Sequence, residues 1–368
     1  MRKPAKTQER GGGPRLTVLI AALLLSQQPE QRLPVRELLR LGGDAVDARV
    51  SFGSVDRIAI GPQRQIVVMA ANDHKVSVFD SAGRFLVSMG RSGSGPGEFQ
   101  FMTGLRVDSL IHVFDVRQER VSSFDFQGRH RETRRFTLEG LSLAEFVPSG
   151  SGVVGATVTR FTRTEAPERE GIIAVVFARG ARVDTLITYR GGAGTWFVPN
   201  QYAPWGGFPA PTGNGGAWLA FADTIVVADG VTGRVRWFTT TEGSGTPRLL
   251  KELSLGLVAR RVSDEDRNRF LAELRQKQKD LPPRVQIEAP AHWSVATRIL
   301  RAPDGTLWIR NGHSGRAGNS YSEIPPGAQT VRRWQLPDGF ALHAVHGNRL
   351  VGVQTTEFDS PMVVVYQR

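Results

Sequence analysis

The histidines are the residues of this chain best suited to bind a divalent metal or to transfer a proton. The chain has 7 of them. Metal sites often place two histidines close together in sequence, as in H-x-H or H-E-x-x-H, but neither pattern occurs, and no Asp or Glu cluster stands at ligand spacing. A site would have to be assembled from distant segments, for example from Asp56, Glu145, His292 and His343. We therefore assign no metal ligand and expect no cofactor, and we keep a divalent ion in a channel as part of an alternative.

No residue is an obvious nucleophile. The chain contains no cysteine, which excludes a thiol nucleophile, disulfide bonds and the acylated cysteine of a lipoprotein. The stretch GRSGSGPGEF at 90–99 is rich in glycine, but a phosphate-binding loop needs a strand before it and a helix after it. A strand-like run follows here, so these glycines are expected to shape a turn, because glycine tolerates positive φ and close backbone approach. We predict no catalytic residue.

Aromatic side chains gather in one segment that is poor in charge. Residues 190–215 contain Trp196, Tyr202 and Trp205 among glycines and prolines, and no charged residue follows Arg190 there. Exposed apolar patches usually mark binding sites. The segment is therefore expected either to pack as a lid on the surface beneath it or to present its rings to a ligand.

Short strands are the elements that must position these residues. From residue 55 onward, runs of apolar and β-branched residues alternate with turn clusters, which is typical of many antiparallel strands. The runs form units of four that repeat about every 40 residues, the spacing of propeller blades. The first unit is VDRIAI, QIVVMA, KVSVF and RFLVSM, and the sixth reaches the C-terminus with only three strands.

A strand-like segment at about 35–43 precedes the first unit and has no partner of its own. It would supply the fourth strand of the last unit in a closed ring, and ring closure removes exposed sheet edges. The sequence therefore predicts an all-β fold, a six-bladed β-propeller of four-stranded antiparallel blades over residues 32–368. The blades begin at about residue 55, and the N-terminal strand completes the last one.

Residues 79–125 resemble the NHL repeat of six-bladed propellers, within the TolB-like propeller superfamily. The repeat joins a strand ending in F-D-x-x-G to a glycine-rich crossing, a V-D pair, and a loop from an aspartate to a basic residue and valine. Its residues here are Phe79, Asp80, Gly83, Gly90, Gly93, Gly95, Pro96, Gly97, Phe99, Val107, Asp108, Asp115, Arg120 and Val121. The resemblance implies a six-bladed ring. Some relatives are metal-dependent lyases and others are lactonases.

The long insertions are expected on one face of the ring. In a propeller blade, the link from the second to the third strand and the link to the next blade leave on the same side. The insertions at 160–170, 190–215, 256–293, 312–319 and 355–360 all belong to these two classes, whereas the links of the other side are tight turns. Function usually resides in long loops on a rigid scaffold, so this face is the predicted functional face.

One insertion, at about 256–292, contains a predicted helix. Ser263 can cap it, acidic residues follow at 264–266, and Pro282 and Pro283 would stop it, in keeping with the signals for helix ends. Its apolar stripe of Phe270, Leu271 and Leu274 is narrow. A narrow stripe favours a helix that lies over the functional face rather than one buried in a core.

Residues 1–31 have the pattern of an export signal or an N-terminal anchor. A basic stretch at 1–15 is followed by an apolar run at 16–25 and a polar stretch at 26–31. A membrane-spanning helix needs roughly 20 apolar residues, which favours a signal, with an uncleaved anchor as the other outcome. We expect an exported protein, periplasmic or extracellular, that contacts a membrane only through such a segment.

The net charge of +12 comes mostly from arginine. A basic surface can bind nucleic acid or an acidic polymer, but an exported chain seldom meets nucleic acid, and composition alone can produce an arginine excess. We expect a protein, peptide or carbohydrate ligand, no nucleic acid, and a monomer.

The interpretation favoured by these patterns is an exported binding or interaction module that uses the insertion-rich face near the channel mouth. The alternative is a metal-dependent enzyme of the lactonase or lyase type. The predicted ligand contacts are Asp73, His74, Arg117, Trp196, Tyr202, Trp205, His292, Trp293 and His313.

Overall fold

A computed structural model describes residues 29–43, 50–136, 145–149, 152–161, 170–179, 182–192, 195–197, 207–209, 216–239, 247–277, 292–312, 319–358 and 360–368. The proposed signal at 1–31 lies almost wholly outside these residues. No helix in the described part is long and apolar enough to cross a membrane.

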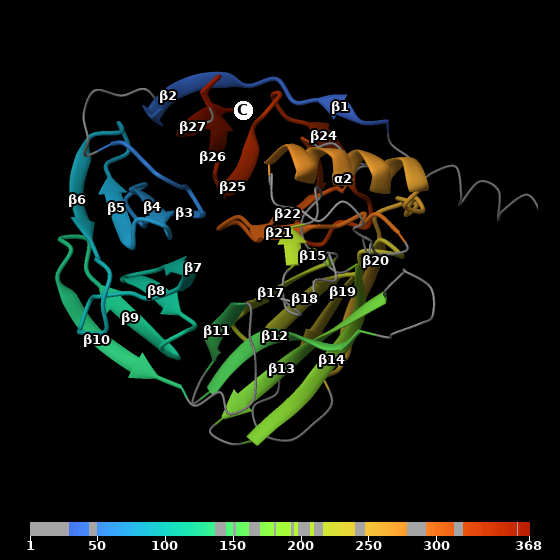
Figure 1. Ribbon diagram of the computed structural model, residues 1–368, viewed down its shortest axis with the longest axis horizontal. Coiled ribbons are helices and arrows are strands. Elements are labelled where there is room, and N and C mark those ends of the chain that lie inside the picture. The colour runs from blue at the N-terminus through green and yellow to red at the C-terminus, as the bar shows by residue number, and fades with distance from the viewer. Residues whose placement is uncertain are drawn as a thin grey trace, which may run out of the picture.

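Six antiparallel sheets are arranged in a ring, and each is a blade of the predicted propeller (Figure 1). Each blade runs outward from an innermost strand. Blades 1 to 3 comprise β3 (Arg57–Ile60), β4 (Ile66–Ala70), β5 (Lys75–Phe79) and β6 (Phe85–Met89); β7 (Met102–Val107), β8 (Ile111–Asp115), β9 (Arg120–Phe124) and β10 (His130–Arg135); and β11 (Glu145–Ser149), β12 (Gly152–Phe161), β13 (Glu170–Arg179) and β14 (Arg182–Gly192).

The other three blades complete the ring. They comprise β17 (Ala217–Phe221), β18 (Thr224–Ala228), β19 (Arg234–Thr239) and β20 (Leu249–Ser254); β21 (Arg298–Arg301), β22 (Leu307–Arg310), β23 (Ser320–Ile324) and β24 (Arg332–Gln335); and β25 (Ala341–His346), β26 (Arg349–Thr355) and β27 (Pro361–Gln367) with β2 (Arg36–Gly42) outermost. A small hairpin of β15 (Thr195–Phe197) and β16 (Gly207–Pro209) and a helix, α2 (Asp264–Lys277), lie in links between blades. The all-β, six-bladed prediction is confirmed.

The two ends of the chain meet in the last blade. Strand β2 pairs antiparallel with β27, from Arg36 opposite Gln367 to Gly42 opposite Met362, and thus occupies the outer position that the sequence assigns to residues 35–43. A pairing that the sequence did not predict precedes it, because β1 (Gln31–Arg32) adds in parallel to β24 of blade 5. The N-terminal segment therefore spans the outer edges of two blades.

The core lies between neighbouring blades. Successive residues of a strand point to opposite faces of its sheet, and each blade packs against a neighbour on either side. The strands are therefore apolar on both faces. Between blades 1 and 2, the buried side chains include Val67, Met69, Phe99 and Met102. Between blades 5 and 6, Trp308, Tyr321, Phe340 and Tyr366 belong to one buried cluster, and the Phe340 and Tyr366 rings meet edge to face at 4.9 Å, a preferred aromatic geometry.

Candidate functional site

The two faces of the ring carry links of different length. On one side are the link from β6 to β7 at 90–101, the link from β20 to β21 that contains α2, and the link from β26 to β27 at 356–360. On the other side, the described links are turns, such as 61–65, 80–84 and 125–129. We call the first side the insertion-rich face. In Figure 1, helix α2 is drawn over blade 5, next to β22 and β24.

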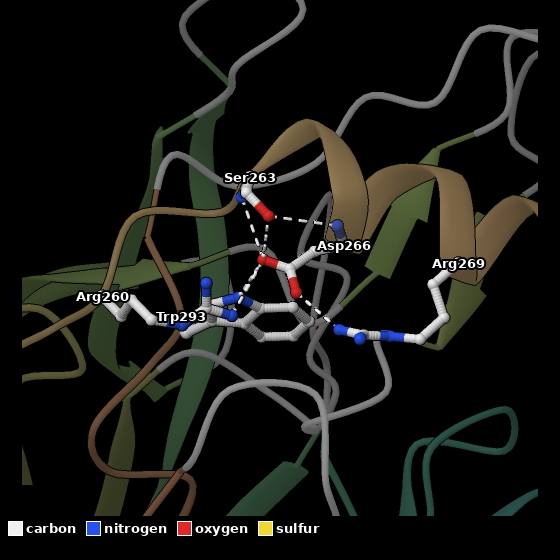
Figure 2. A network of polar contacts seen from close by, with 5 residues as sticks. All are labelled: Arg260, Ser263, Asp266, Arg269 and Trp293. Atoms are coloured by element: carbon white, nitrogen blue, oxygen red, sulfur yellow. Dashed lines mark hydrogen bonds and ion pairs between the residues drawn. The ribbon is translucent and has the colours of Figure 1, made fainter.

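A buried carboxylate fixes the start of α2 (Figure 2). Asp266 is 5% exposed. Its Oδ2 accepts hydrogen bonds from the backbone N–H of Ser263 at 2.9 Å, the Ser263 hydroxyl at 2.9 Å, Arg260 Nη2 at 2.8 Å and the Trp293 indole N–H at 3.1 Å, and its Oδ1 accepts from Arg269 Nη2 at 2.6 Å. The carboxylate thereby joins the helix to the chain segments on both of its sides.

The same residue closes the N-terminal cap. The backbone N–H of Asp266 donates to the Ser263 hydroxyl at 3.2 Å, while its carboxylate accepts from the backbone of Ser263, which is the reciprocal arrangement of a capping box. Burial by itself would raise the pKa of Asp266, but hydrogen bonds from Ser263 and Trp293 and the Arg260 guanidinium hold that pKa well below its ordinary value. The helix begins after Ser263, as predicted, and its predicted stop at Pro282 lies outside the described residues.

The glycine-rich crossing is built around a buried arginine. Arg120 is 2% exposed, and its guanidinium donates to the carbonyl oxygens of Ser94 at 3.0 Å, Gly95 at 2.9 Å and Glu98. At Gly90, with φ of 95°, an added Cβ would lie 2.5 Å from the His74 carbonyl oxygen. In these contacts the motif residues hold the backbone of the crossing in place. The glycine-rich crossing therefore has a structural role, as the sequence predicts.

Three predicted ligand contacts lie in short turns of the insertion-rich face. Asp73 is exposed and accepts a hydrogen bond from the backbone N–H of Gly53 at 3.0 Å. His74 follows in the β4–β5 turn with φ of 51°, a left-handed conformation that is uncommon outside glycine. Arg117 is exposed in the turn between β8 and β9. They belong to blades 1 and 2, so the structure brings them to one side of the face.

The other predicted contacts fall on the remaining insertions. Trp196 lies in β15 opposite Phe208, and His292 forms an isolated bridge with Arg261. Trp293 is 3% exposed and donates to Asp266, so its indole anchors α2 from inside. Tyr202, Trp205 and His313 lie outside the described residues.

The innermost strands bring together polar residues that the sequence analysis did not identify as ligand contacts. Thr103 in β7, Arg57 in β3, His343 in β25 and Arg298 in β21 belong to four consecutive blades around the ring. Arg310 in β22 pairs directly with Arg298. We call these five residues the axial cluster. Arg57 and Arg298 each open an innermost strand and Arg310 ends a second strand, so all three lie at the end of the blades that faces the insertions.

The charge of this cluster is positive. Burial lowers the pKa of His343 well below its ordinary value, and the charges of Arg298, Arg57 and Arg310 lower it further. His343 is therefore a neutral imidazole at physiological pH. It is 9% exposed, and its Nδ1 has no hydrogen-bond partner among the described residues.

Of the four residues suggested for a metal site, the structure describes the side chains of Asp56, His292 and His343, and the side chain of Glu145 lies outside the described part. The Asp56 carboxylate accepts from the Ser54 hydroxyl and from the backbone N–H of Ala71, both at 2.7 Å, and so closes a local turn. His292 lies beside α2, whereas His343 lies in an innermost strand. Within the residues that the structure describes, no three side chains of His, Asp or Glu form a group that could hold a metal ion.

A shallow depression lies farther out on the insertion-rich face, in blade 6. It encloses about 600 Å³, and its lining includes Arg40, Asp338, Gln354, Glu357 and Met362. Both signs of charge are present, so the lining favours polar contacts of either sign. Its residues at 355–357 belong to the predicted insertion at 355–360, but none of its lining is among the predicted ligand contacts, because its walls come from strands and links about 300 residues apart in sequence.

Residues 47–149 match the DUF5128 family, described as a 6-bladed beta-propeller. Among solved structures, an exported-type protein from Bacteroides fragilis is 11% identical, with 92% of this chain and 98% of that chain covered and a TM-score of 0.48. A DUF4221 family member from Bacteroides vulgatus is 12% identical, with 92% and 98% covered and a TM-score of 0.47.

Virginiamycin B lyase from Staphylococcus aureus is 6% identical, with 91% of this chain and 99% of that chain covered and a TM-score of 0.44. No curated protein matches the chain. At such identities the solved structures do not bear on ligand or activity. The family match over the first blades and the six sheets of the ring agree, and the protein is a six-bladed β-propeller.

Proposed function

We propose that this protein is an exported propeller that binds a ligand with its insertion-rich face, near the end of the ring axis. The observation that carries the proposal is the one-sided distribution of the links, together with the clamp that holds α2 on that side. A helix fixed by a buried carboxylate with five hydrogen bonds is a preorganised element, and rigid support of a surface lowers the entropy cost of binding.

The ligand class follows from the surface of that face. Asp73 and Arg117 offer exposed charges, and Phe101 is an apolar side chain that is 59% exposed. Such mixed surfaces suit a peptide, a protein loop or a carbohydrate. The lactonase or lyase alternative has less support, because Asp56 closes a local turn and no three His, Asp or Glu side chains of the described residues form a group that could hold a metal ion.

Paired variants test the choice of face. A panel of glycans, peptides and small organic acids would be screened against the full chain by thermal shift, and hits would be measured by calorimetry. Arg117→Ala and Phe101→Ala change the insertion-rich face, whereas Gln127→Ala and Asn348→Ala change exposed turns of the opposite face. We expect only the first pair to weaken binding, and the reverse pattern would refute the proposal.

Export is tested separately. A fusion of residues 1–31 to a reporter that is active only outside the cytoplasm should give activity. Replacing the apolar run at 16–25 by polar residues should abolish it, because that run is the part a signal requires. An inactive fusion with the native segment would contradict export.

A further inference from the structure

We propose that the axial cluster is an anion site that binds the oxyanion group, carboxylate or phosphate, of a small ligand at the insertion-rich end of the ring axis. This inference rests on the proposed function and names the chemistry of its ligand. Its residues are Arg57, Thr103, Arg298, Arg310 and His343, contributed by four neighbouring blades.

Two β-bulges lie in the innermost strands near this end of the ring. In β25 the pairing shifts between Leu342 and Ala344, which leaves His343 as the extra residue. In β7 it shifts between Met102 and Gly104, which leaves Thr103 as the extra residue. Bulges re-aim side chains and are frequent beside functional sites. Here β7 and β25, the innermost strands on either side of β3, each contain a bulge near the end that faces the insertions.

Both extra residues carry an orphaned polar atom. The hydroxyl of Thr103 and Nδ1 of His343 are buried and have no hydrogen-bond partner among the described residues. A buried polar group without a partner destabilises the folded state, and such groups in native proteins are usually explained by a water, an ion or a ligand. Each of these atoms can accept a partner from outside the chain, and His343 Nδ1 lies in the field of Arg298, Arg57 and Arg310.

The arginines make the site positively charged. Arg298, Arg310 and Tyr321 pair in register across three strands of blade 5, so their side chains lie on one face of that sheet. The Tyr321 hydroxyl accepts a hydrogen bond from the backbone N–H of Leu342 at 2.9 Å, which shows that this face packs against blade 6, next to His343. Each guanidinium has five N–H donors in a planar fork, so an arginine that already contacts a protein group retains donors for an oxyanion.

A cation does not fit this arrangement. Two guanidinium groups from blade 5 and a third from β3 surround a neutral imidazole, and their combined positive potential repels metal ions and amines. A neutral imidazole and a hydroxyl can each donate one hydrogen bond to an oxyanion, and arginine binds carboxylate or phosphate in bidentate fashion. The shared chemistry is therefore an oxyanion, with two candidate headgroups.

The test is calorimetry of the full chain with inorganic phosphate and, separately, with citrate, each against chloride at equal ionic strength. Arg298→Gln should weaken the binding of the preferred anion about 10- to 100-fold, as expected for a lost hydrogen bond to a charged group. The matched control is Arg301→Gln, at the other end of the same strand, where Arg301 stacks on Phe221. The control should bind as the wild type does.

Thr103→Val separates a ligand contact from a structural role. The variant keeps the shape and removes the orphaned hydroxyl, so the free protein should unfold at the same temperature or higher while anion binding weakens. Phosphate preferred over citrate would indicate a phosphate headgroup, and the opposite order a carboxylate. No binding of either anion by the wild type, or equal losses in Arg298→Gln and Arg301→Gln, would overturn the anion site.

The two proposals can fail separately. If the wild type binds no oxyanion but Arg117→Ala still weakens a ligand from the panel, the anion site is wrong and the choice of face stands. If opposite-face variants weaken the panel ligand while Arg298→Gln does not, both proposals fail.

Discussion

Replacing Asp266 by alanine should release the start of α2 from the propeller. The change removes the acceptor of the Ser263 backbone N–H and of the Trp293 indole N–H. It also removes the partner of Arg260 and Arg269, whose side chains are about half exposed. Water can replace the carboxylate for the arginines but not for the indole, since Trp293 is only 3% exposed.

The expected cost can be worked from these contacts. Loss of a helix cap costs about 1 kcal/mol, and a buried N–H left without a partner costs about 1–3 kcal/mol. Each partly exposed ion pair adds at most about 1 kcal/mol. Because the groups share one acceptor, their contributions overlap, and we expect a loss of about 2–4 kcal/mol in the local stability of α2.

Hydrogen exchange of the α2 amides measures this loss directly, because local opening is read at the residues that open. The control is Asp264→Ala in the same turn, whose side chain is 91% exposed and pairs only with Arg267 among the contacts described. It should cost at most about 1 kcal/mol through the helix dipole. If the two variants exchange alike, Asp266 does not anchor the helix and the reasoning is refuted.

Three further predictions concern stability. The pKa of Asp266 is lower in the folded state, so its contribution to the stability of α2 is complete above the unfolded pKa of about 3.9 and is lost as pH falls through the folded pKa. Hydrogen exchange of α2, corrected for intrinsic rates, should therefore be unchanged from pH 7 to 5 and accelerate only below about pH 4. Acceleration above pH 5 would contradict this. Arg120→Met should lower the free energy of unfolding, measured in urea, by about 2–4 kcal/mol because three carbonyls lose their donor. The control Arg84→Met, whose side chain is 83% exposed, should lower it by less than about 0.5 kcal/mol. Equal urea midpoints for the two variants would refute the structural role of the glycine-rich crossing. Deleting residues 29–43 removes β1 and β2 and should abolish cooperative unfolding and monodispersity, measured by urea titration and size-exclusion chromatography, because the edge of β27 is then exposed.

Strands with a regular pattern could be predicted almost to the residue. The expected runs VDRIAI, QIVVMA, KVSVF and RFLVSM of the first unit contain β3, β4, β5 and β6, and their ends agree within two residues, because glycine, proline or aspartate turns bound each run. Blade 3 differs. Strands β12 and β13 pair out to Phe161 opposite Gly171, so part of the expected loop at 160–170 continues the hairpin. Backbone pairing can extend through residues of no clear apolar period, and that extension leaves little trace in sequence.

The axial cluster could not be predicted for a related reason. Its residues are separated by up to 286 positions between Arg57 and His343, and only ring closure makes β3 and β25 neighbours. Two members are the extra residues of bulges, and a bulge changes by one residue which side chains lie on a given face of the sheet. Trp293 shows the converse. Its aromatic type and its place in an insertion predict an exposed contact, whereas its polar edge finds a partner in Asp266 and the ring is buried.

The position of the axial cluster links ligand binding to the closure of the ring. His343 lies in the blade that β2 completes, and Arg57 opens the blade that follows β2 in the chain. A ligand held by both residues would bridge blades 6 and 1, beside the blade in which the two chain ends meet. Because it would bind only the closed ring, it would stabilise that ring against unfolding in proportion to the logarithm of its concentration. Backbone pairing of β2 with β27 closes blade 6 at its outer edge, and a ligand at the axis would add contacts between blades 6 and 1 at the inner end, where β25 lies beside β3.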